Sequence, residues 1–352
     1  MIRVIYFNHW FSAITPVVED LKKTFGNSVQ IIASSHNENH TIKNSVDKFI
    51  VEDTDCDYVD TILNICKDNN VDLFFVRKNA KLIANRRTEF EAIGVKLILE
   101  DNEAIELTTN KAKTYEFFKE SGLEHFIPFF VNPKNIKDNN ILEGMSLEDT
   151  IKASGSFVVP NLCMKLVTDE GGCSFRKIEN DNLTMQSLSY YRVNKATKDE
   201  VIKFIRSGDT EIEKLMFMEY LDEPEISVDC YNSKKGFIAI ARKKTGSRVE
   251  ELYYDTDLYN ICNKICEMLQ LKFPFNVQFR VKHGGDSNCI MDLRLLEINL
   301  RISGGMYLEV AHGLNICELC MKDNLDETDY GFDKYVNFER KLVTHVEKAV
   351  KI

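Results

Sequence analysis

The sequence predicts an α/β fold of more than one domain, and two observations support this: the order of its segments and the size of its apolar content. Over residues 1–102, short apolar runs of strand length alternate with segments of helical periodicity, an order that is typical of parallel strands with covering helices. The chain has 352 residues, of which 44% are hydrophobic. It can therefore bury a substantial core, and we expect two or three domains.

The first strand and helix show this pattern most clearly. The run RVIYF has strand length, and the segment TPVVEDLKKTFG offers Thr15 as an N-cap, Pro16 at the first helical position and Gly26 as a stop. Four further runs predict strands, namely VQIIAS, KFIV, DLFFVR and VKLIL. We therefore assign residues 1–102 to an N-terminal Rossmann-like parallel-sheet domain.

Composition excludes several classes of partner. The formal net charge is -10, from 55 acidic and 45 basic residues, and no strongly basic block is present. Nucleic acid is therefore not an expected partner, because phosphate neutralisation needs clustered Lys and Arg. No apolar run approaches the roughly 18 residues of a membrane span. The start of the chain lacks a secretory cleavage region, and we expect a cytoplasmic protein.

The ten cysteines are scattered, which predicts reduced and mostly buried thiols. Cys317 and Cys320 have the spacing of a redox or metal motif, but a second such pair with partner histidines is missing. Because their segment reads as an apolar helix, packing in the core is the favoured interpretation.

The end of the first strand carries an unusual polar trio, Asn8, His9 and Trp10. Ligands gather at such strand ends in open α/β sheets, so contact with an acid substrate is one interpretation and a plain turn is the other. The segment YFNHWFSAITP has no glycine between the first strand and its helix. The absence of this dinucleotide fingerprint disfavours a hydride-transfer enzyme.

From residue 103 the pattern changes. TTNKAKTYEFFKESGL predicts a helix capped by Thr109 and ended by Gly122, a polar surface connection follows over 131–149, and the runs at 157–167 and 215–221 predict strands. The later segment DTDLYNICNKICEMLQL has apolar residues on one helical face.

Two segments of this region suit a nucleotide. MKLVTDEGGCSFRK places Lys165 in a strand before the turn of Gly171 and Gly172, where backbone N–H groups can approach phosphate oxygens. FMEYLDEPEISVDC places Glu219 and Glu225 around a crossing between strands, which can offer backbone groups to a base and a carboxylate to ribose. A plain hairpin turn and an exposed acidic loop are the alternatives.

The stretch LLEINLRISGG sets three polar residues two apart in an apolar run. In a strand, Glu297, Asn299 and Arg301 share one face while Leu296, Ile298 and Leu300 pack behind them. The polar groups could form a ligand site, and the alternative is an edge strand with one solvated face.

Together these segments resemble the ATP-grasp superfamily, most closely the carbamoyl-phosphate-synthetase-like carboxylate–amine ligases. NVQFRV with LEINLRISGG looks like the family's terminal metal-binding strands, NKAKTYEFFKESGL like its first ATP-contacting helix, CMKLVTDEGGCSF like its phosphate loop and MEYLDEPEISVD like its adenine and ribose hinge. The resemblance implies a two-lobed ATP-grasp domain over 103–352, with a small lobe at about 156–221 and a C-terminal lobe at about 222–340.

The resemblance also implies roles for the matching residues. ATP phosphates would be held by two lysines and a glycine-rich loop, adenine and ribose by the hinge, and Mg²⁺, or Mn²⁺ in its place, by oxygen ligands. Arg301 and Lys165 would be the catalytic residues. The implied sets are Lys111, Lys165, Gly171 and Gly172 for the phosphates, Glu219, Tyr220 and Leu221 for adenine, Glu225 for ribose, and Gln278, Glu297 and Asn299 for the metal.

Three positions depart from the family's usual pattern. Asn110 stands where Asp often precedes the first lysine, Leu166 follows Lys165 in place of Pro, and Leu300 follows the metal-ligand Asn in place of Pro. These departures bear on catalytic competence more than on the fold.

The resemblance implies an ATP-dependent ligase that joins a small-molecule carboxylate to an amine through an acyl phosphate, with release of ADP and phosphate. The alternative is a non-catalytic or regulatory ATP-binding protein of the same fold. A homodimer is an open alternative to a monomer. The sequence names neither substrate, because specificity lies in loop geometry.

Overall fold

The structure is a computed structural model, which describes residues 2–131, 161–169, 171–179, 194–207, 214–246, 249–325, 327, 331–336 and 338–345. The chain forms two compact units: the first comprises Met1–Glu106, Ile226–Gln278 and Glu297–Ile352, and the second Leu107–Glu225 and Phe279–Leu296. We describe the units one at a time. The connection expected over 131–149 lies almost wholly outside the described residues, as do residues 157–160 of the strand expected next.

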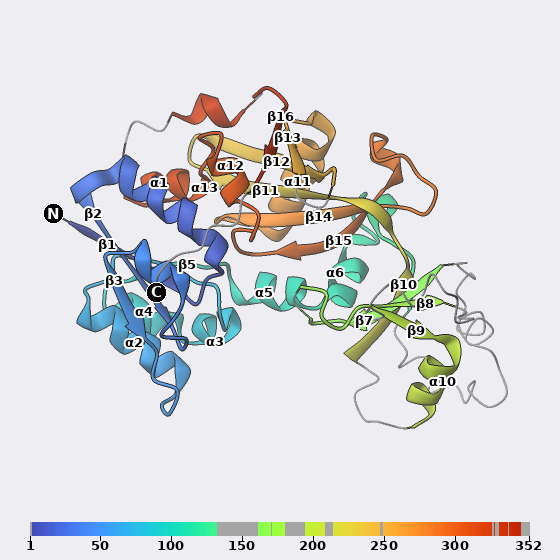
Figure 1. Cartoon of the computed structure of the whole chain (residues 1–352), viewed down its shortest axis with the longest axis horizontal. Coiled ribbons are helices and arrows are strands. Elements are labelled where there is room, and N and C mark those ends of the chain that lie inside the picture. The colour runs from blue at the N-terminus through green and yellow to red at the C-terminus, as the bar shows by residue number, and fades with distance from the viewer. Residues whose placement is uncertain are drawn as a thin grey trace. The chain divides into compact units, whose positions relative to one another are not determined.

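The N-terminal sheet is fully parallel, as the sequence predicted. Its strand order is β3-β2-β1-β4-β5, and every neighbouring pair runs parallel (Figure 1, blue to cyan). The strands are β1 (Arg3–Asn8), β2 (Val29–Ser35), β3 (Lys48–Val51), β4 (Leu73–Phe75) and β5 (Lys96–Ile98).

The helices that follow these strands begin and end for local reasons. They are α1 (Thr15–Phe25), α2 (Tyr58–Asp68), α3 (Ala80–Asn85) and α4 (Arg87–Ala92). The prediction that Thr15 caps α1 is wrong, because the 3₁₀ helix η1 (Ser12–Ile14) runs directly into α1 and Thr15 is already helical. Gly26 ends the helix with φ 52°, a left-handed conformation that favours glycine.

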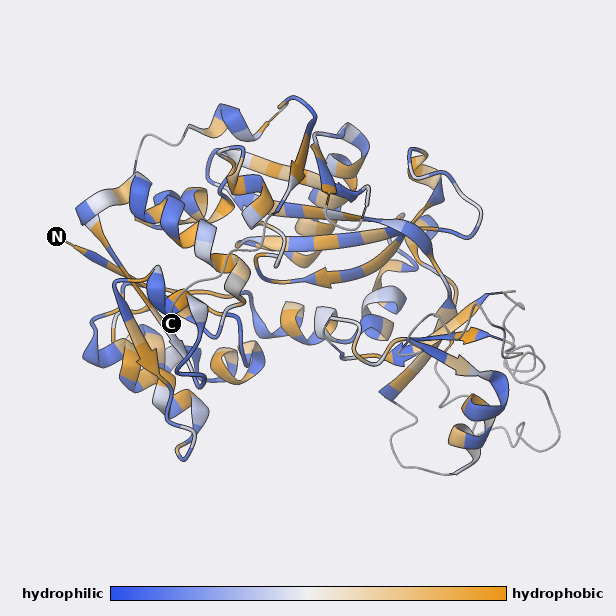
Figure 2. Cartoon of the chain, in the orientation of Figure 1, coloured by the Kyte–Doolittle hydropathy of each residue, from blue (hydrophilic) through white to orange (hydrophobic). Residues whose placement is uncertain are grey.

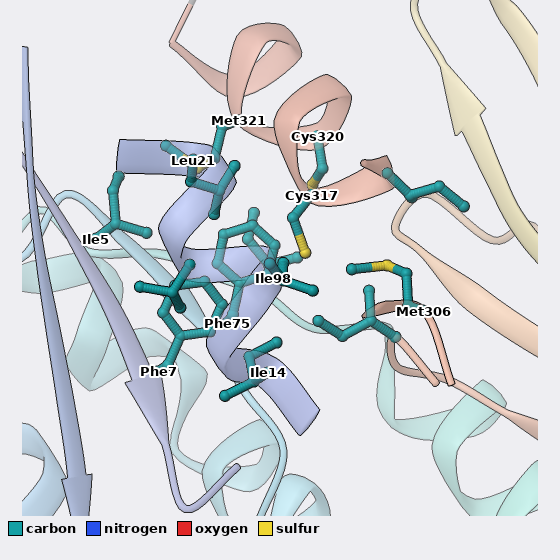
Figure 3. Packing of buried hydrophobic residues seen from close by; sticks show 14 of the residues in the cluster. Ile5, Phe7, Ile14, Leu21, Phe75, Ile98, Met306, Cys317, Cys320 and Met321 are labelled. Carbon is teal, nitrogen blue, oxygen red and sulfur yellow. The ribbon is translucent and has the colours of Figure 1, made fainter. Parts of the chain in front are cut away.

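A hydrophobic core of the first unit combines the N-terminal sheet with C-terminal helices. Phe7, Phe75 and Ile98 of the sheet belong to one buried cluster with Leu21 of α1 and with α13 (Ile316–Asn324) (Figure 3). Cys317 and Cys320 lie in this cluster and are fully buried, so the prediction of core packing is confirmed. Along β14 (Phe275–Val281), apolar residues alternate with polar ones in the sequence FNVQFRV (Figure 2).

The largest sheet has six strands in the order β15-β14-β11-β12-β13-β16, with β15 at one edge. Its strands are β11 (Asp222–Ser233), β12 (Gly236–Lys244), β13 (Val249–Tyr253), β14 (Phe275–Val281), β15 (Leu293–Asn299) and β16 (Lys341–Thr344). The predicted amphipathic helix is α11 (Thr256–Leu269), capped by the Asp255 side chain, and α12 (Tyr307–Val310) follows β15.

The second unit is built on a sheet with the order β6-β10-β7-β8-β9. Its strands are β6 (Phe130–Val131), β7 (Leu162–Leu166), β8 (Arg176–Glu179), β9 (Lys195–Thr197) and β10 (Leu215–Glu219), and its last helix is α10 (Lys198–Arg206). The other 3₁₀ helices among the described residues are η2 (Gly26–Ser28), η3 (Thr41–Asn44), η4 (Glu124–Phe126), η6 (Ile290–Asp292) and η7 (Phe332–Tyr335).

The helix predicted after residue 103 is two helices, α5 (Asn102–Thr109) and α6 (Lys111–Phe118). The predicted cap Thr109 is wrong, because Thr109 ends α5 and Asn110 caps α6 by accepting from the Lys113 backbone N–H at 3.1 Å. Asn110 thus performs the capping that an aspartate would perform at the same position. Among the described residues, no helix has the length and apolar character needed to cross a membrane.

Candidate functional site

The polar residues at the end of β15 are half-buried. Nδ2 of Asn299 donates to Oε1 of Glu297 at 2.9 Å, so these two side chains share one face, as alternation predicted. Arg301 lies beyond the strand, where its backbone N–H donates to the Asn299 carbonyl at 2.8 Å and its guanidinium lies 3.5 Å from Asn299 Oδ1. Glu297, Asn299 and Arg301 therefore form one local group.

The apolar side of this stretch differs from the prediction. Ile298 is buried, but Leu296 and Leu300 are only half-buried, because β15 is the edge strand of its sheet. The two interpretations offered for the stretch are therefore compatible: the strand is an edge strand, and its polar residues are also grouped. Gln278 is half-buried on the neighbouring strand β14.

Arg242 forms a buried charge cluster on the same sheet, in the first unit. Its guanidinium, 3% exposed, donates to Asp229 Oδ2 at 2.8 Å, to Glu250 Oε2 at 2.6 Å and to Glu309 Oε1 at 3.0 Å. It also donates to the hydroxyls of Ser227 and Ser303, on β11 and just after β15. From the sequence alone, the run RKK at 242–244 is compatible with a solvated charge run or with an anion-binding site. The guanidinium of Arg242 has neither role, because carboxylates enclose it.

The loop after Arg301 depends on this cluster. A Cβ atom on Gly305 would lie 2.2 Å from the NH1 atom of Arg242, so only glycine fits beside the guanidinium. Asn276 on β14 donates to Ser227 Oγ, to the Val228 carbonyl and to Asp229 Oδ1 at 2.9–3.2 Å. The cluster therefore joins β11, β12, β14 and the segment after β15.

In the second unit, Lys111 at the start of α6 is buried and paired. Its Nζ donates to the Asp169 carbonyl oxygen at 2.5 Å and lies 3.3 Å from Asp169 Oδ1. Asp169 accepts from the backbone N–H of Ser174 at 2.9 Å and from its hydroxyl. Burial acts to raise the pKa of Asp169, but the Ser174 hydrogen bonds and Lys111 outweigh it and lower the pKa.

The two glycines between these residues take the conformation that a tight turn requires. Gly171 and Gly172 both have φ 68°, and a Cβ atom on either would have no neighbour within 4 Å. Lys165 is 4% exposed on β7, and the Lys111 backbone N–H donates to the Val167 carbonyl just beyond that strand. The loop, both lysines and Asp169 thus belong to one part of the second unit.

The hinge residues hold neighbouring segments of the second unit in place. Oε1 of Glu219 accepts from the Phe129 backbone N–H at 2.9 Å, and the Tyr220 backbone N–H donates to the Asn161 carbonyl at 2.8 Å. Lys177 of β8 lies 4.3 Å from the Tyr220 ring centroid, a cation–π contact. Leu221, which follows Tyr220 in the hinge, is buried.

Glu225 lies on β11 and has a basic neighbour that the sequence did not indicate. Its Oε2 is 3.7 Å from Nε of Arg280 on β14, and the carboxylate of Glu223 is 3.8 Å from NH2 of the same arginine. Because β12, β13 and α11 separate Glu225 from Arg280 in the sequence, local spacing gives no signal for this pair.

The trio at the end of β1 divides into structural residues and one accessible residue. Asn8 is fully buried and donates to Tyr58 Oη and to the Lys78 carbonyl, and Trp10 is buried and donates to the Phe75 carbonyl at 3.3 Å. His9 is half-buried with φ 50°, and its ring stacks on His36. Only His9 is therefore placed to meet a ligand.

A parallel-sheet domain followed by two lobes is the architecture of the ATP-grasp fold, and solved structures with that fold match nearly the whole chain. The biotin carboxylase domain of 2-oxoglutarate carboxylase from Hydrogenobacter thermophilus, complexed with MgADP, ADP and bicarbonate, matches with TM-score 0.64 and 14% identity over 97% of this chain and 74% of that one.

Two further solved enzyme structures also match most of this chain. N5-carboxyaminoimidazole synthetase from Staphylococcus aureus, complexed with ADP, has TM-score 0.62 and 12% identity over 93% of this chain and 78% of that one. L-amino acid ligase from Bacillus licheniformis has TM-score 0.57 and 12% identity over 92% and 74%.

Residues 211–349 match a family model described as ATP-grasp in the biosynthetic pathway with Ter operon. This segment is thus similar to ATP-grasp proteins, and the matched solved structures show that the chain has the ATP-grasp fold, as its motifs indicated. A search of curated proteins gives no match.

Proposed function

We propose that this protein is an ATP-dependent ligase that joins a carboxylate to an amine. The observation that carries the proposal is the group at the end of β15, where Glu297 and Asn299 are hydrogen-bonded and Arg301 follows. The matched structures with ADP or MgADP support the use of ATP. Two of the matched proteins, a synthetase and an amino acid ligase, support a ligase reaction.

In the proposed reaction, a carboxylate oxygen attacks the γ-phosphorus of ATP, and the bond between that phosphorus and the β,γ-bridging oxygen breaks to release ADP. The amine nitrogen then attacks the carbonyl carbon of the acyl phosphate, phosphate leaves with its bonding electrons, and the nitrogen loses a proton. Activation is needed because a carboxylate is a poor electrophile. Phosphoryl transfer itself depends mainly on positioning and charge neutralisation.

The metal-binding residues in this proposal are Gln278, Glu297 and Asn299. One carboxylate and two side-chain amides on neighbouring strands are hard oxygen donors, which fit the preference of Mg²⁺ and also accommodate Mn²⁺. When bound, the ion would neutralise charge on the phosphates of ATP. Arg301 steadies the transferred phosphoryl group.

The second unit binds the rest of the nucleotide. Lys111 and Lys165 are buried cations and hold phosphate oxygens, while the backbone of the loop at Gly171 and Gly172 covers them. The hinge at Glu219, Tyr220 and Leu221 receives the adenine, and Glu225 receives the ribose. Lys165 and Arg301 are the catalytic residues of the proposal. The alternative remains a protein of this fold that binds ATP without joining substrates.

The decisive experiment is a screen of amino acids and small acids, bicarbonate included, for stimulated nucleotide turnover with Mg²⁺. We expect one acid and amine pair to stimulate release of ADP and phosphate. AMP and pyrophosphate as the major products would rule out the acyl-phosphate route. Nucleotide binding without stimulated turnover by any pair would favour the non-catalytic alternative.

Glu297→Gln tests the carrying observation. It keeps the size of the side chain but removes its charge, so turnover should fall by about a hundredfold to a thousandfold while unfolding free energy changes by about 0.5 kcal/mol or less. Arg301→Ala should behave similarly, and Leu300→Ala should lower stability through lost packing. Normal turnover in Glu297→Gln would mean that this strand end is not the metal site.

A further inference from the structure

The ends of three adjacent parallel strands bring together residues that suit a transition metal. His9 directly follows β1, His36 directly follows β2 and Glu52 directly follows β3, and these strands are neighbours in the sheet. Ligating atoms of the three side chains all lie within 4.8 Å of one another. The site is confined to the first unit and is distinct from the residues at the end of β15.

The backbone fixes two of these residues. The His9 backbone N–H donates to the Ser34 carbonyl at 2.8 Å, and the Arg77 guanidinium donates to the His9 carbonyl at 3.0 Å. The Glu52 backbone N–H donates to the Ser35 carbonyl at 3.0 Å. His9 is thereby held in a left-handed conformation, φ 50°, that is uncommon for a residue other than glycine.

The side chains have the arrangement of a ligand set with its own supporting contacts. The Ser35 hydroxyl lies 3.3 Å from Nδ1 of His9, and the Ser34 hydroxyl donates to Oε1 of Glu52 at 2.7 Å. Such hydrogen bonds orient metal ligands in known sites. Tyr6 Oη lies 2.5 Å from the Ser34 hydroxyl and extends the support into the core.

Glu52 is a buried carboxylate, 5% exposed, that no lysine or arginine of the described chain pairs with at 4.0 Å or less. Buried carboxylates are normally paired with a cation or bind a metal. Within the described part of the chain, the one side-chain hydrogen bond to Glu52 comes from the neutral hydroxyl of Ser34. The structure around Glu52 therefore favours a bound cation.

We propose that His9, His36 and Glu52 bind a divalent transition-metal ion, which we take to be Zn²⁺. Two imidazoles and one carboxylate are a known zinc ligand set that leaves a fourth position open. In a tetrahedral site with bonds of about 2.0–2.2 Å, ligand atoms stand about 3.3 Å apart. The exposed side chain of His36 can close the remaining distance by rotation.

The charges around the site indicate what fills the open position. The Arg77 guanidinium donates to the His9 carbonyl at 3.0 Å, which places a cationic side chain beside the site. This cation opposes a bare metal ion but favours an anion bound to it. We therefore expect a carboxylate or similar anion as the exchangeable ligand.

The test uses the purified full chain after chelator treatment. Titration with Co²⁺, read by its visible absorption, and with Zn²⁺, read by calorimetry and by metal analysis, should give one ion per chain. His36→Gln and Glu52→Gln should each weaken binding by about a hundredfold or more, since loss of a supporting contact alone costs ten- to a hundredfold. A Zn²⁺-dependent rise in melting temperature should be present in the wild type and lost in His36→Gln, whose fold an exposed substitution leaves intact.

Two controls separate this site from its neighbours. His40→Gln should keep binding, because Nδ1 of His40 already accepts from the Ile42 backbone N–H at 3.2 Å. Cys56→Ser should also keep binding, since Cys56 is exposed and hydrogen-bonded to Asp53. Binding that survives both ligand variants, or an intense thiolate-to-cobalt band that Cys56→Ser removes, would overturn the proposal. Failure to bind either ion at micromolar concentration would overturn it as well.

Discussion

Two buried cations, Arg242 in the first unit and Lys111 in the second, are paired in different ways. Arg242 contacts three carboxylates, from β11, β13 and α12. Among the described residues, Lys111 contacts the carboxylate of Asp169, which belongs to a loop beside two glycines. A cation that is surrounded by several carboxylates on strands and a helix is not available to bind a ligand. A cation whose carboxylate partner lies on a loop can exchange that partner for a phosphate, so burial alone does not separate structure from function.

The largest effect should come from Arg242→Met. The change leaves Asp229, Glu250 and Glu309 buried without their cation, which typically costs about 3–5 kcal/mol of unfolding free energy. Urea or thermal unfolding measures the loss, and Lys244→Met, at an exposed position of the same strand, should change stability by about 0.5 kcal/mol or less. Equal stability of the two variants would show that Arg242 is not a structural cation.

Lys111→Met should act on nucleotide binding more than on stability. It removes a charge expected to meet phosphate, and charge-assisted hydrogen bonds contribute about 1.5–3 kcal/mol, which corresponds to roughly a tenfold to a hundredfold loss of affinity for a Mg²⁺–ATP analogue. The exposed Lys113→Met on the same helix is the matched control. A large loss of stability with unchanged analogue affinity would place Lys111 in the same structural class as Arg242.

Glu309→Gln should change the pH dependence of stability, which tests the protonation of Glu309 in the Arg242 cluster. Burial, and then the neighbouring Asp229, raise the pKa of Glu309 well above 4.5, so the folded protein keeps a proton that the unfolded chain loses. The contribution of this proton to the free energy of unfolding is complete below about pH 4.5 and decreases as pH rises above that value. Glutamine does not ionise, so the variant should lose less stability between about pH 5 and 8. Urea titrations at both values measure this, and Glu339→Gln, which is exposed, should keep the wild-type slope.

The sequence predicted the fold well because the signals of the fold are local. Apolar runs of strand length gave every strand of the N-terminal sheet, and alternation placed Glu297 and Asn299 on one face. Helix starts failed at Thr15 and Thr109 because neighbouring residues compete for the cap: a preceding 3₁₀ turn took one, and the Asn110 side chain took the other.

The candidate site could be predicted only where its residues are close in sequence. Arg242 is 67 residues from Glu309, so its sequence context suggested a solvated charge or an anion site while long-range contacts made it structural. His36 and Glu52 gave no local signal either, since each is an isolated polar residue after a strand. A useful rule for this fold is to compare the first residue after each parallel strand, because those residues meet at one edge of the sheet.

The smallest effect should come from Asp169→Asn, which tests whether the Lys111 pair is exchangeable. The pKa of Asp169 is lowered, so this side chain is ionised at neutral pH and competes with phosphate for Lys111. The amide keeps the shape but weakens that competition, and we expect affinity for a Mg²⁺–ATP analogue to rise about threefold, or less than 1 kcal/mol.

Hydrogen exchange over Gly171 to Arg176 gives the second measurement on the same variant. This loop buries little apolar surface, so it should open easily without nucleotide and gain protection with it. In Asp169→Asn the free protein should exchange faster, because the hydrogen bonds that Ser174 donates to the carboxylate become weaker. The analogue-bound variant should exchange at the wild-type rate, since Lys111 then holds phosphate. A tenfold loss of affinity with unchanged exchange would show instead that Asp169 supports the bound nucleotide and does not compete with it. Lys111 and Arg242 would then both be fixed cations.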